Sequence, residues 1–368
     1  MINVLNVITD TNIGGAGNVL LNFMKSTNRG EFEHTVIVPE GAMLTPRLHE
    51  LDIRTVEMKG IAEQSLSIGS IKAFQNEYKL ISPDVVHTHA SLSARIAARR
   101  WGSCAVVHTR HSAYPQGRLK TSFPAKQALG FLNNRLSDVM IAISPAARDN
   151  LIDTGADPRK IITMFNGVEP VRRLDDAEKA AARESLGIGS EFVCASIARL
   201  VPEKGHRYIL DAAEMLLNLP VRFIIAGAGP MESSLRAQAD ERGLVNCIFT
   251  GFVHDVAPIE NIADLQLNAS YGTETSSLSL LEGMSLGVPS VASDYGGNPY
   301  IVTDGENGFI VPQHDGAAIA NAVRKLYENP EMLAQMGIKA LSAYNERFNS
   351  SVMAANIEKA YREAISRK

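Results

Sequence analysis

The chain has 368 residues, of which 45% are hydrophobic and 21% are charged, and its formal net charge is -4 at pH 7. These values exclude a disordered, collagen-like or coiled-coil protein, and the length exceeds what a single hydrophobic core usually organises. The three cysteines, Cys104, Cys194 and Cys247, lie far apart in or beside apolar runs, which indicates neither a disulfide framework nor a zinc site. Asp10 comes too early for a signal peptide, and no apolar run approaches the roughly 18 residues of a membrane-spanning helix, so we expect a cytoplasmic protein.

Short runs of β-branched residues alternate with segments of helical periodicity along the first half of the chain. These runs occupy residues 3–10, 34–39, 84–89, 104–109, 138–144 and 160–165. Strands that alternate with helices in this way predict a parallel sheet. The alternation within two of the runs places His87 and His108 inside strands.

The same pattern restarts after the charged segment 172–187. The second set of runs lies at 192–200, 221–229, 246–252, 265–270, 289–294 and 308–312. We therefore predict an α/β protein with two Rossmann-like, doubly wound domains, 1–168 and 189–348, joined by a hinge at 169–188. Doubly wound domains bind ligands beyond the carboxyl ends of their strands, so we expect the site in the loops that follow the strands, at a central cleft between the domains.

The C-terminal segment 349–368 has the periodicity of an amphipathic helix. Its apolar positions are Val352, Ala355, Ile357, Ala360, Tyr361 and Ile365. Such a stripe needs a surface to cover it, and we expect this helix to cross back to the first domain.

Two glycine-rich loops follow predicted strands. Gly14 and Gly15 let backbone N–H groups approach a ligand oxygen near a helix N-terminus, although a simple tight turn explains them equally well. Gly227 and Gly229 resemble a dinucleotide-binding fingerprint. However, Glu232 stands where close helix packing requires glycine or alanine, and the next strand ends without a carboxylate for a ribose, which argues against NAD.

Two cations flank a turn at the end of a predicted strand in the second half. Arg199 and Lys204 enclose a turn that contains Pro202 and Gly205, so both side chains can point into the cleft. Two cations of this kind suit a diphosphate, because arginine binds two oxygens at once and lysine acts as a point charge. A solvated turn with two ordinary basic residues is the alternative explanation.

The segment 268–297 holds the greatest density of candidate residues. Glu274 lies in a loop, and Ser276 or Ser277 can cap a following helix that carries Glu282. The N-terminus of this helix offers free N–H groups to a phosphate, and the two carboxylates can accept hydrogen bonds from sugar hydroxyls. Glu282 has largely apolar neighbours, and a carboxylate in such surroundings usually has a partner.

These segments together resemble the retaining GT-B glycosyltransferases of family 4, the glycosyl transferases group 1. The paired glutamates occur with ARLVPEKG, GAGP, NGV at 166–168 and DGENGFIVP at 304–312, and the similarity spans nearly the whole chain. The resemblance implies two Rossmann-like domains facing a central cleft. It also implies transfer of a sugar from a nucleotide-diphosphate sugar, first of all a UDP-sugar, to a hydroxyl acceptor in cell-surface polysaccharide or glycolipid assembly, with the nucleotide-sugar as a co-substrate and no cofactor.

The resemblance assigns roles to individual residues. Arg199 and Lys204 would bind the diphosphate, Glu282 the ribose hydroxyls, and Glu274 the transferred sugar. His111 matches the family histidine that faces the sugar from the first domain, so the implied catalytic residues are His111, Glu274, Arg199 and Lys204. The implied donor-binding residues are Gly14, Gly15, Arg199, Lys204, Gly227, Gly229, Phe252, Val253, Glu274, Ser277, Leu278, Ser279 and Glu282. No Asp-x-Asp pair is placed to chelate a metal, so we expect metal-independent activity.

Two positions depart from the family pattern. Thr275, Ser276 and Ser277 stand where the family often has Gly-Phe-Gly, and Pro299-Tyr300 stands where it often has Pro-Glu. Both departures leave the frame for the donor intact and leave the identity of the sugar open.

The stretch 85–137 contains no acidic residue. Its cations are Arg95, Arg99, Arg100, Arg110, Arg118, Lys120, Lys126 and Arg135. A basic, partly apolar part of this stretch, 114–136, can lie against anionic lipid or bind an anionic acceptor, although a solvated helix face explains it equally well. We expect a lipid-linked or anionic acceptor and peripheral contact with the inner face of an anionic membrane, and no nucleic-acid partner.

The acceptor-side candidates are His89, Arg110, Arg118 and Lys120. For His89, a satisfied histidine beneath the active-site loop is at least as good an interpretation as a catalytic one.

Other functions remain open at this point. A GT-B-related nucleotide-sugar epimerase or phosphorylase would use a similar cleft without a separate acceptor, or with phosphate in its place. A non-catalytic two-domain sugar-binding protein has no need of paired cations for a diphosphate, so it fits the sequence less well.

Overall fold

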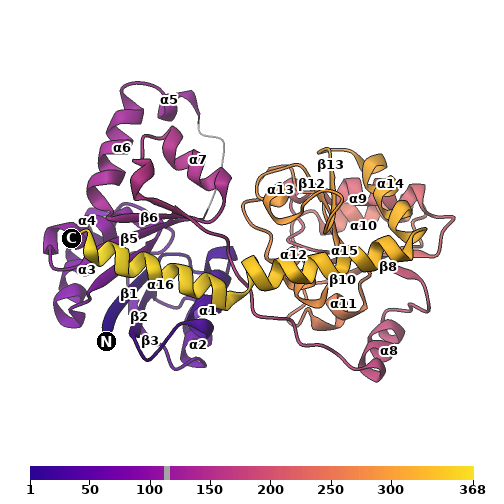
Figure 1. Cartoon of the computed structure of the whole chain (residues 1–368), viewed down its shortest axis with the longest axis horizontal. Helices are drawn as coiled ribbons and strands as arrows, with labels where there is room; N and C mark the ends of the chain where they lie inside the picture. Colours follow the sequence, from indigo (N-terminus) through magenta and orange to yellow (C-terminus); the bar gives the residue numbers. More distant parts are fainter. Residues whose placement is uncertain (112–116, 273) are drawn as a thin grey trace. The chain divides into compact units, whose positions relative to one another are not determined.

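The computed structural model describes residues 1–111, 117–272 and 274–368. The chain forms two compact units (Figure 1). The first consists of Met1–Gly167 together with Ser350–Lys368, and the second consists of Val168–Asn349. The segment 169–188, expected as a hinge, therefore lies in the second unit, and the C-terminal segment returns to the first.

The described part of the first unit contains a seven-stranded parallel sheet in the order β3-β2-β1-β4-β5-β6-β7. The strands are β1 (Ile2–Ile8), β2 (Phe32–Pro39), β3 (Arg54–Met58), β4 (Val85–His89), β5 (Ala105–Arg110), β6 (Val139–Ala142) and β7 (Ile161–Thr163). The strand order reverses between β1 and β4, so the loops that follow these two strands diverge and leave a crevice at their carboxyl ends. β3 lies at the edge of the sheet and is the strand that the sequence analysis missed.

Helices cover this first sheet. They are α1 (Gly15–Ser26), α2 (Leu44–His49), α3 (Ile68–Ile81), α4 (Leu92–Trp101), α5 (Arg118–Thr121), α6 (Ala125–Leu136), α7 (Pro145–Asp153), the 3-10 turn η1 (Pro158–Lys160) and α16 (Ser350–Ser366). Figure 1 shows α16, in yellow, beside α1, and it also contacts β4, β5 and β6. None of the helices in the described ranges is both long and apolar enough to cross a bilayer.

The buried face of α16 differs in part from the expected stripe. Ile357, Ala360 and Tyr361 are buried as predicted, whereas Ala355 and Ile365 are exposed. Their places on the buried face are taken by Met353, Ala354, Glu358 and Ala364. The face that the helix buries is thus shifted by a fraction of a turn from the expected stripe.

The second unit repeats the architecture with a six-stranded parallel sheet, counted over its described residues, in the order β10-β9-β8-β11-β12-β13. The strands are β8 (Phe192–Ile197), β9 (Val221–Ala226), β10 (Cys247–Gly251), β11 (Leu265–Asn268), β12 (Ser290–Ser293) and β13 (Gly308–Val311). Here the order reverses between β8 and β11, which places the crevice of this sheet at the loops that carry Arg199 and Glu274.

The remaining helices belong to the second unit. They are α8 (Asp176–Ser185), η2 (Pro202–Lys204), α9 (His206–Met215), α10 (Glu232–Glu241), α11 (Ala257–Ile262), α12 (Leu278–Leu286), α13 (Asn298–Ile301), α14 (Gly316–Tyr327), α15 (Pro330–Ala343) and the π-helical turn η3 (Tyr344–Phe348). α8 packs against α11, which explains why part of the expected hinge is a folded element of this unit. Its start is fixed by a capping box, in which Asp175 and Glu178 each accept a backbone N–H of the other.

Candidate active site

The loop that follows β8 carries Arg199 on the exposed surface of the second unit. Two glycines after β9 support this loop from below. Gly227 has a φ of +143°, and a Cβ built on it would overlap the carbonyl oxygen of Ala198, while one on Gly229 would overlap that of Leu200. The sequence analysis placed both glycines in the donor-binding set. Their close contacts with the backbone show that they also fix the course of the loop that presents Arg199.

Lys204 and Glu274 form an ion pair, with 2.6 Å between the lysine Nζ and the glutamate Oε2. The pair is well shielded, since the two side chains are 15% and 5% exposed. The same Oε2 accepts hydrogen bonds from Asn268 Nδ2 at 3.1 Å and from Ser270 Oγ at 3.2 Å. All these bonds use one oxygen of the carboxylate, which leaves Oε1 as the oxygen that can accept from a ligand.

Asn268 and Ser270 were missed by the sequence analysis. They stand at the end of β11, where a buried strand passes into the loop that bears Glu274. Two polar residues directly after an apolar run at a strand end are the signal that could have identified them. Their hydrogen bonds orient the carboxylate of Glu274, as the bond from Lys204 does.

The loop around Glu274 is held by the chain after β12. The backbone N–H of Gly297 donates to the carbonyl oxygen of Glu274 at 3.0 Å, and a Cβ on Gly296, which has a φ of +61°, would overlap that same oxygen. The hydroxyl of Tyr295 donates to the carbonyl oxygen of Gly272 at 2.6 Å. Thr273 lies outside the described residues.

The N-terminus of α12 lacks a side-chain cap. Ser277 is the N-cap residue, but its hydroxyl accepts from Asn268 Nδ2 at 3.0 Å and lies 3.2 Å from the hydroxyl of Ser279. The expectation that Ser276 or Ser277 caps this helix is therefore wrong, because the strand-end amide of Asn268 competes for the hydroxyl. The first N–H groups of the helix, from Leu278 onward, keep their capacity to bind an anion.

Glu282 lies one turn into α12 and is half-buried. Burial raises the pKa of its carboxyl to about 7. The sequence analysis expected a partner for it, but no hydrogen bond or ion pair reaches its carboxyl from the residues that the structure describes. A second buried carboxyl, that of Glu260 on α11, accepts from the side-chain amide of Gln266, and burial and the charge of Glu282 raise its pKa well above the usual range.

The loop after β10 carries Phe252 and Val253. Phe252 is 68% exposed, and its ring makes an edge contact with the His254 ring, with 4.8 Å between the ring centroids. Val253 packs against the apolar cluster around α11. The chain thus places one aromatic ring in the open at the carboxyl edge of the second sheet and anchors it through its neighbour.

In the first unit, Gly14 and Gly15 stand at the start of α1, and Gly14 is its N-cap residue. A Cβ on either glycine would meet no atom within 4 Å, and neither glycine has a positive φ. Neither packing nor backbone conformation therefore explains these two glycines. They leave open space in front of a helix N-terminus, as a ligand oxygen requires.

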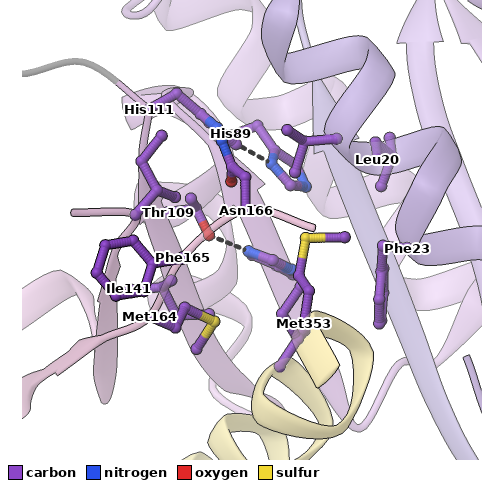
Figure 2. Close-up of a pocket in the computed structure, with 14 residues that line it drawn as sticks. Leu20, Phe23, His89, Thr109, His111, Ile141, Met164, Phe165, Asn166 and Met353 are labelled. Carbon is purple, nitrogen blue, oxygen red and sulfur yellow. Dashed lines mark hydrogen bonds between the residues drawn. The ribbon is translucent and has the colours of Figure 1, made fainter. Parts of the chain in front are cut away.

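His111 follows β5 and contacts His89 at the end of β4 (Figure 2). His111 Nε2 and His89 Nδ1 are 2.8 Å apart, and the two rings are stacked. Burial lowers the pKa of His111 to about 4, and burial together with neighbouring histidines lowers the pKa of His89 well below its usual range. Both rings are therefore neutral at pH 7. His89 is buried, and it is joined to a second candidate instead of standing alone.

Two further predictions for this region concern the histidines inside strands. His87 and His108 are buried in β4 and β5, as the alternation predicted. His87 Nε2 lies 2.7 Å from the hydroxyl of Thr109, and its Nδ1 lies 2.7 Å from the hydroxyl of Tyr361 on α16. The C-terminal helix thus reaches the strand that carries His89.

The other acceptor-side candidates lie at the end of β5 and on α5. Arg110, at the end of β5, donates to Asn150 Oδ1 on α7 at 2.8 Å. Arg118 and Lys120 are exposed on α5. Residues 112–116, which connect these positions and include the start of the basic stretch, lie outside the described residues. Over the ranges that are described, no three side chains of His, Cys, Asp or Glu are grouped as a metal site.

Two family models cover nearly the whole chain. Residues 13–172 match the model described as Glycosyltransferase Family 4, and residues 178–342 match the one described as Glycosyl transferases group 1. The D-inositol 3-phosphate glycosyltransferase of Streptomyces scabiei is 30% identical over 77% of this chain and 68% of its own length. A UDP-Gal:alpha-D-GlcNAc-diphosphoundecaprenol alpha-1,3-galactosyltransferase of Escherichia coli is 26% identical over 86% of both chains.

Solved structures show the same fold over almost the full length. Anabaena HepE in complex with UDP has a TM-score of 0.85 at 21% identity, covering 98% of this chain and 99% of its own. A glycosyltransferase from Rickettsia africae has a TM-score of 0.86 at 17% identity, covering 100% of this chain and 99% of its own. With two doubly wound units of this topology and family models matched in both, the chain is a GT-B glycosyltransferase and belongs to glycosyltransferase family 4.

Proposed function

We propose that this glycosyltransferase moves a sugar from a UDP-sugar to a hydroxyl acceptor, with retention of the anomeric configuration and without a metal or resident cofactor. The observation that carries the proposal is the Lys204–Glu274 pair beside the uncapped N-terminus of α12. This arrangement supplies cationic and N–H donors for a diphosphate and a carboxylate oxygen for a sugar hydroxyl within one loop system. The complexes of HepE with UDP and with UDP-glucose support the choice of donor.

The second unit supplies the donor-binding side chains. Lys204, Arg199 and the N–H groups at Leu278 and Ser279 bind the diphosphate. Glu282, whose carboxyl no described side chain occupies, accepts hydrogen bonds from the ribose hydroxyls. A carboxyl that is half-buried without a partner gains from such a ligand, because the hydroxyls replace the hydrogen bonds that burial removed.

The transfer needs no nucleophile from the protein. The bond between the anomeric carbon and the diphosphate oxygen breaks, and the acceptor oxygen bonds to that carbon on the same face. The acceptor proton passes to the departing diphosphate oxygen, so the products are the glycoside and UDP. Lys204, Arg199 and the α12 N-terminus stabilise the charge that grows on the diphosphate, an electrostatic contribution often worth several kcal/mol. Glu274 holds a hydroxyl of the transferred sugar through Oε1.

For the acceptor, we propose a lipid-linked or anionic molecule used in cell-surface polysaccharide or glycolipid assembly. The Escherichia coli relative carries a diphosphoundecaprenol acceptor in its name. The exposed cations Arg118 and Lys120 and the half-buried Lys126 lie close in sequence to two aromatic rings, Phe123 and Phe131, which are 79% and 72% exposed. Cations interleaved with exposed rings suit peripheral contact with an anionic membrane.

A donor screen tests the proposal directly. The protein is incubated with UDP-glucose, UDP-galactose or UDP-N-acetylglucosamine and a lipid-diphosphate sugar acceptor, with EDTA present throughout. We expect release of UDP and an axial, donor-like anomeric linkage in the product. An inverted linkage would contradict retention, and activity that returns only with manganese or magnesium would contradict metal independence. Product analysis with the donor alone distinguishes an epimerase.

A further inference from the structure

The bond between His89 and His111 requires a definite arrangement of protons. Both rings are neutral at pH 7, so each carries a single N–H. His89 Nδ1 and His111 Nε2 are 2.8 Å apart, and one of them must donate while the other accepts. This contact also engages His111 Nε2, so Nδ1 is the ring nitrogen of His111 that is available to another molecule.

The surroundings of His89 indicate which nitrogen donates. Its second nitrogen, Nε2, is buried and has no hydrogen-bond partner in the described part of the chain. That nitrogen lies in a pocket whose wall includes Leu20, Phe23 and Met353 (Figure 2). If His89 accepted from His111, its own N–H would stand on Nε2, buried and without an acceptor. If His89 donates from Nδ1, its Nε2 carries only a lone pair. A buried N–H without an acceptor is rarer than a buried acceptor without a donor, so donation by His89 is favoured.

We propose that His89 is a positioning residue, which donates its Nδ1–H to His111 Nε2 and so holds His111 in the tautomer that carries its proton on Nδ1. His111 then presents a hydrogen-bond donor to an oxygen of the transferred sugar. The proposal rests on the proposed function in one respect, namely that His111 faces the sugar. The arrangement of protons in the pair does not depend on that function, because it follows from the geometry of two neutral rings.

A second layer keeps His89 in place. The His87 ring packs on it, with 4.4 Å between the centroids, and is itself bonded to Thr109 and Tyr361. The titratable groups next to the pair in the strands are His87 and His108, and Tyr361 on α16 is bonded to His87. All three are neutral at pH 7, because burial lowers the pKa of the histidines and raises the pKa of the tyrosine. None of them imposes a charge that would protonate the pair.

The first test reads the tautomer by nitrogen NMR of the full-length protein labelled with 15N-histidine. Comparison with His111→Gln identifies the signals of His111. We expect a protonated Nδ1 and an unprotonated Nε2 in the wild type, and the same pattern in His89→Asn, whose amide places a donor near the position of Nδ1. His89→Asp offers only an acceptor there and is expected to reverse the tautomer. A wild-type His111 that is protonated on Nε2 would overturn the proposal.

The second test compares turnover in variants that keep or lose a hydrogen-bond donor at position 89. We expect His89→Asn to keep kcat close to the wild-type value, and His89→Asp and His89→Leu to lower it about 10- to 100-fold, as loss of a group that orients a functional histidine does in metal sites. The thermal unfolding of each variant is measured together with its kcat. Equal losses of kcat in the Asn and Leu variants, in proportion to their loss of stability, would show that His89 acts through packing only and would also overturn the proposal.

Failure of the proposed function has a different signature. The tautomer measurement needs no substrate, so it decides the state of the pair even if the wild-type protein transfers no sugar. Absence of transfer by the wild type with every donor would contradict the proposed function, while the NMR result would still confirm or overturn the assignment of protons.

Discussion

The two units carry candidate residues of opposite chemistry. Those of the second unit are charged side chains on backbone packed so closely that glycine is required, as at Gly296 beneath Glu274. Those of the first unit are neutral imidazoles in a buried pocket, and the start of its first helix has open space in front of Gly14. Full charges suit the diphosphate, which keeps its charge throughout, whereas neutral donors and acceptors orient an uncharged sugar without competing for that charge.

The largest expected effect comes from removing the cations of the second unit. We expect Lys204→Ala and Arg199→Ala each to lower kcat on the order of 10²- to 10³-fold, because they stabilise charge on the leaving diphosphate. UDP release under saturating donor measures this.

The two variants should differ in stability. Lys204→Ala leaves a shielded carboxylate without its cation, which costs about 3–5 kcal/mol when such pairs are broken, whereas Arg199 is exposed and its loss should leave the melting temperature unchanged. Unchanged turnover in a folded Arg199→Ala protein would show that Arg199 is an ordinary solvated residue of the turn.

A second prediction concerns the surface of the first unit. Reversing Arg118, Lys120 and Lys126 to Glu should weaken sedimentation with anionic vesicles about 100-fold at low salt, since each basic residue near such a surface contributes about 1 kcal/mol. Binding of the wild type should itself weaken as salt rises, because the field is screened over about 8 Å at physiological ionic strength.

A matched triple variant controls for net charge. Lys25, Lys72 and Lys79 are exposed on the same unit, and their reversal to Glu should leave vesicle binding largely intact. UDP binding should survive both triple variants. A wild-type protein that ignores anionic vesicles at low salt would favour an acceptor free in water.

A variant of His111 tests the role proposed for the first unit. We expect His111→Ala to lower kcat about 10- to 100-fold and to leave the affinity for UDP unchanged, since UDP lacks the sugar that the histidine orients. Calorimetric titration with UDP and turnover with the full donor provide the two values. An equal loss of UDP affinity and of kcat would place the histidine against the nucleotide instead.

The smallest effect is a pH dependence of donor binding. Because the pKa of Glu282 is about 7, its carboxyl is mostly protonated at pH 6 and mostly ionised at pH 8. An ionised carboxylate accepts hydrogen bonds on both oxygens, so UDP affinity should fall several-fold from pH 8 to pH 6. Glu282→Gln should bind more weakly and with no such dependence. The same slope in this variant would assign the titration to another group.

The same residue gives a stability test with a definite sign. The folded-state pKa of Glu282, about 7, lies above the ordinary glutamate value of 4.5, so the native protein binds more protons than the unfolded chain between these two pH values. Stability contributed by the protonated form is therefore lost as pH rises through that window. Above pH 7, Glu282→Gln should be more stable than the wild type, by at most about 3 kcal/mol at about 1.4 kcal/mol per pKa unit.

All the runs of β-branched residues are strands, including the half-buried β10 as well as the fully buried β4. β3 was missed because the charged Arg54 and Glu57 interrupt its short apolar run. Arg199, Lys204 and Glu274 could be proposed from the sequence because charge beside glycine or proline after a strand is a local signal, and Glu282 because its carboxylate has apolar neighbours on a helix.

The contacts that were missed depend on the order of strands. Asn268, which the sequence did not single out, meets Glu274 across a loop. His89 and His111 were both candidates, but their contact follows from the pairing of β4 with β5, which only the sheet establishes. The failure of Ser277 as a cap has the same origin, since its competitor Asn268 comes from the end of β11. Local patterns identify which groups are present, and the topology decides which of them share a proton or a bond.

The return of α16 to the first unit has a consequence for biosynthesis. Tyr361 is fully buried there and packs against Phe23 and Phe32, so residues 1–167 alone would leave these rings uncovered. The second unit is continuous in sequence and can close its core while the ribosome still holds the C-terminus. The first unit is therefore translated first but completes its fold last, because its aromatic residues stay uncovered until α16 has been synthesised.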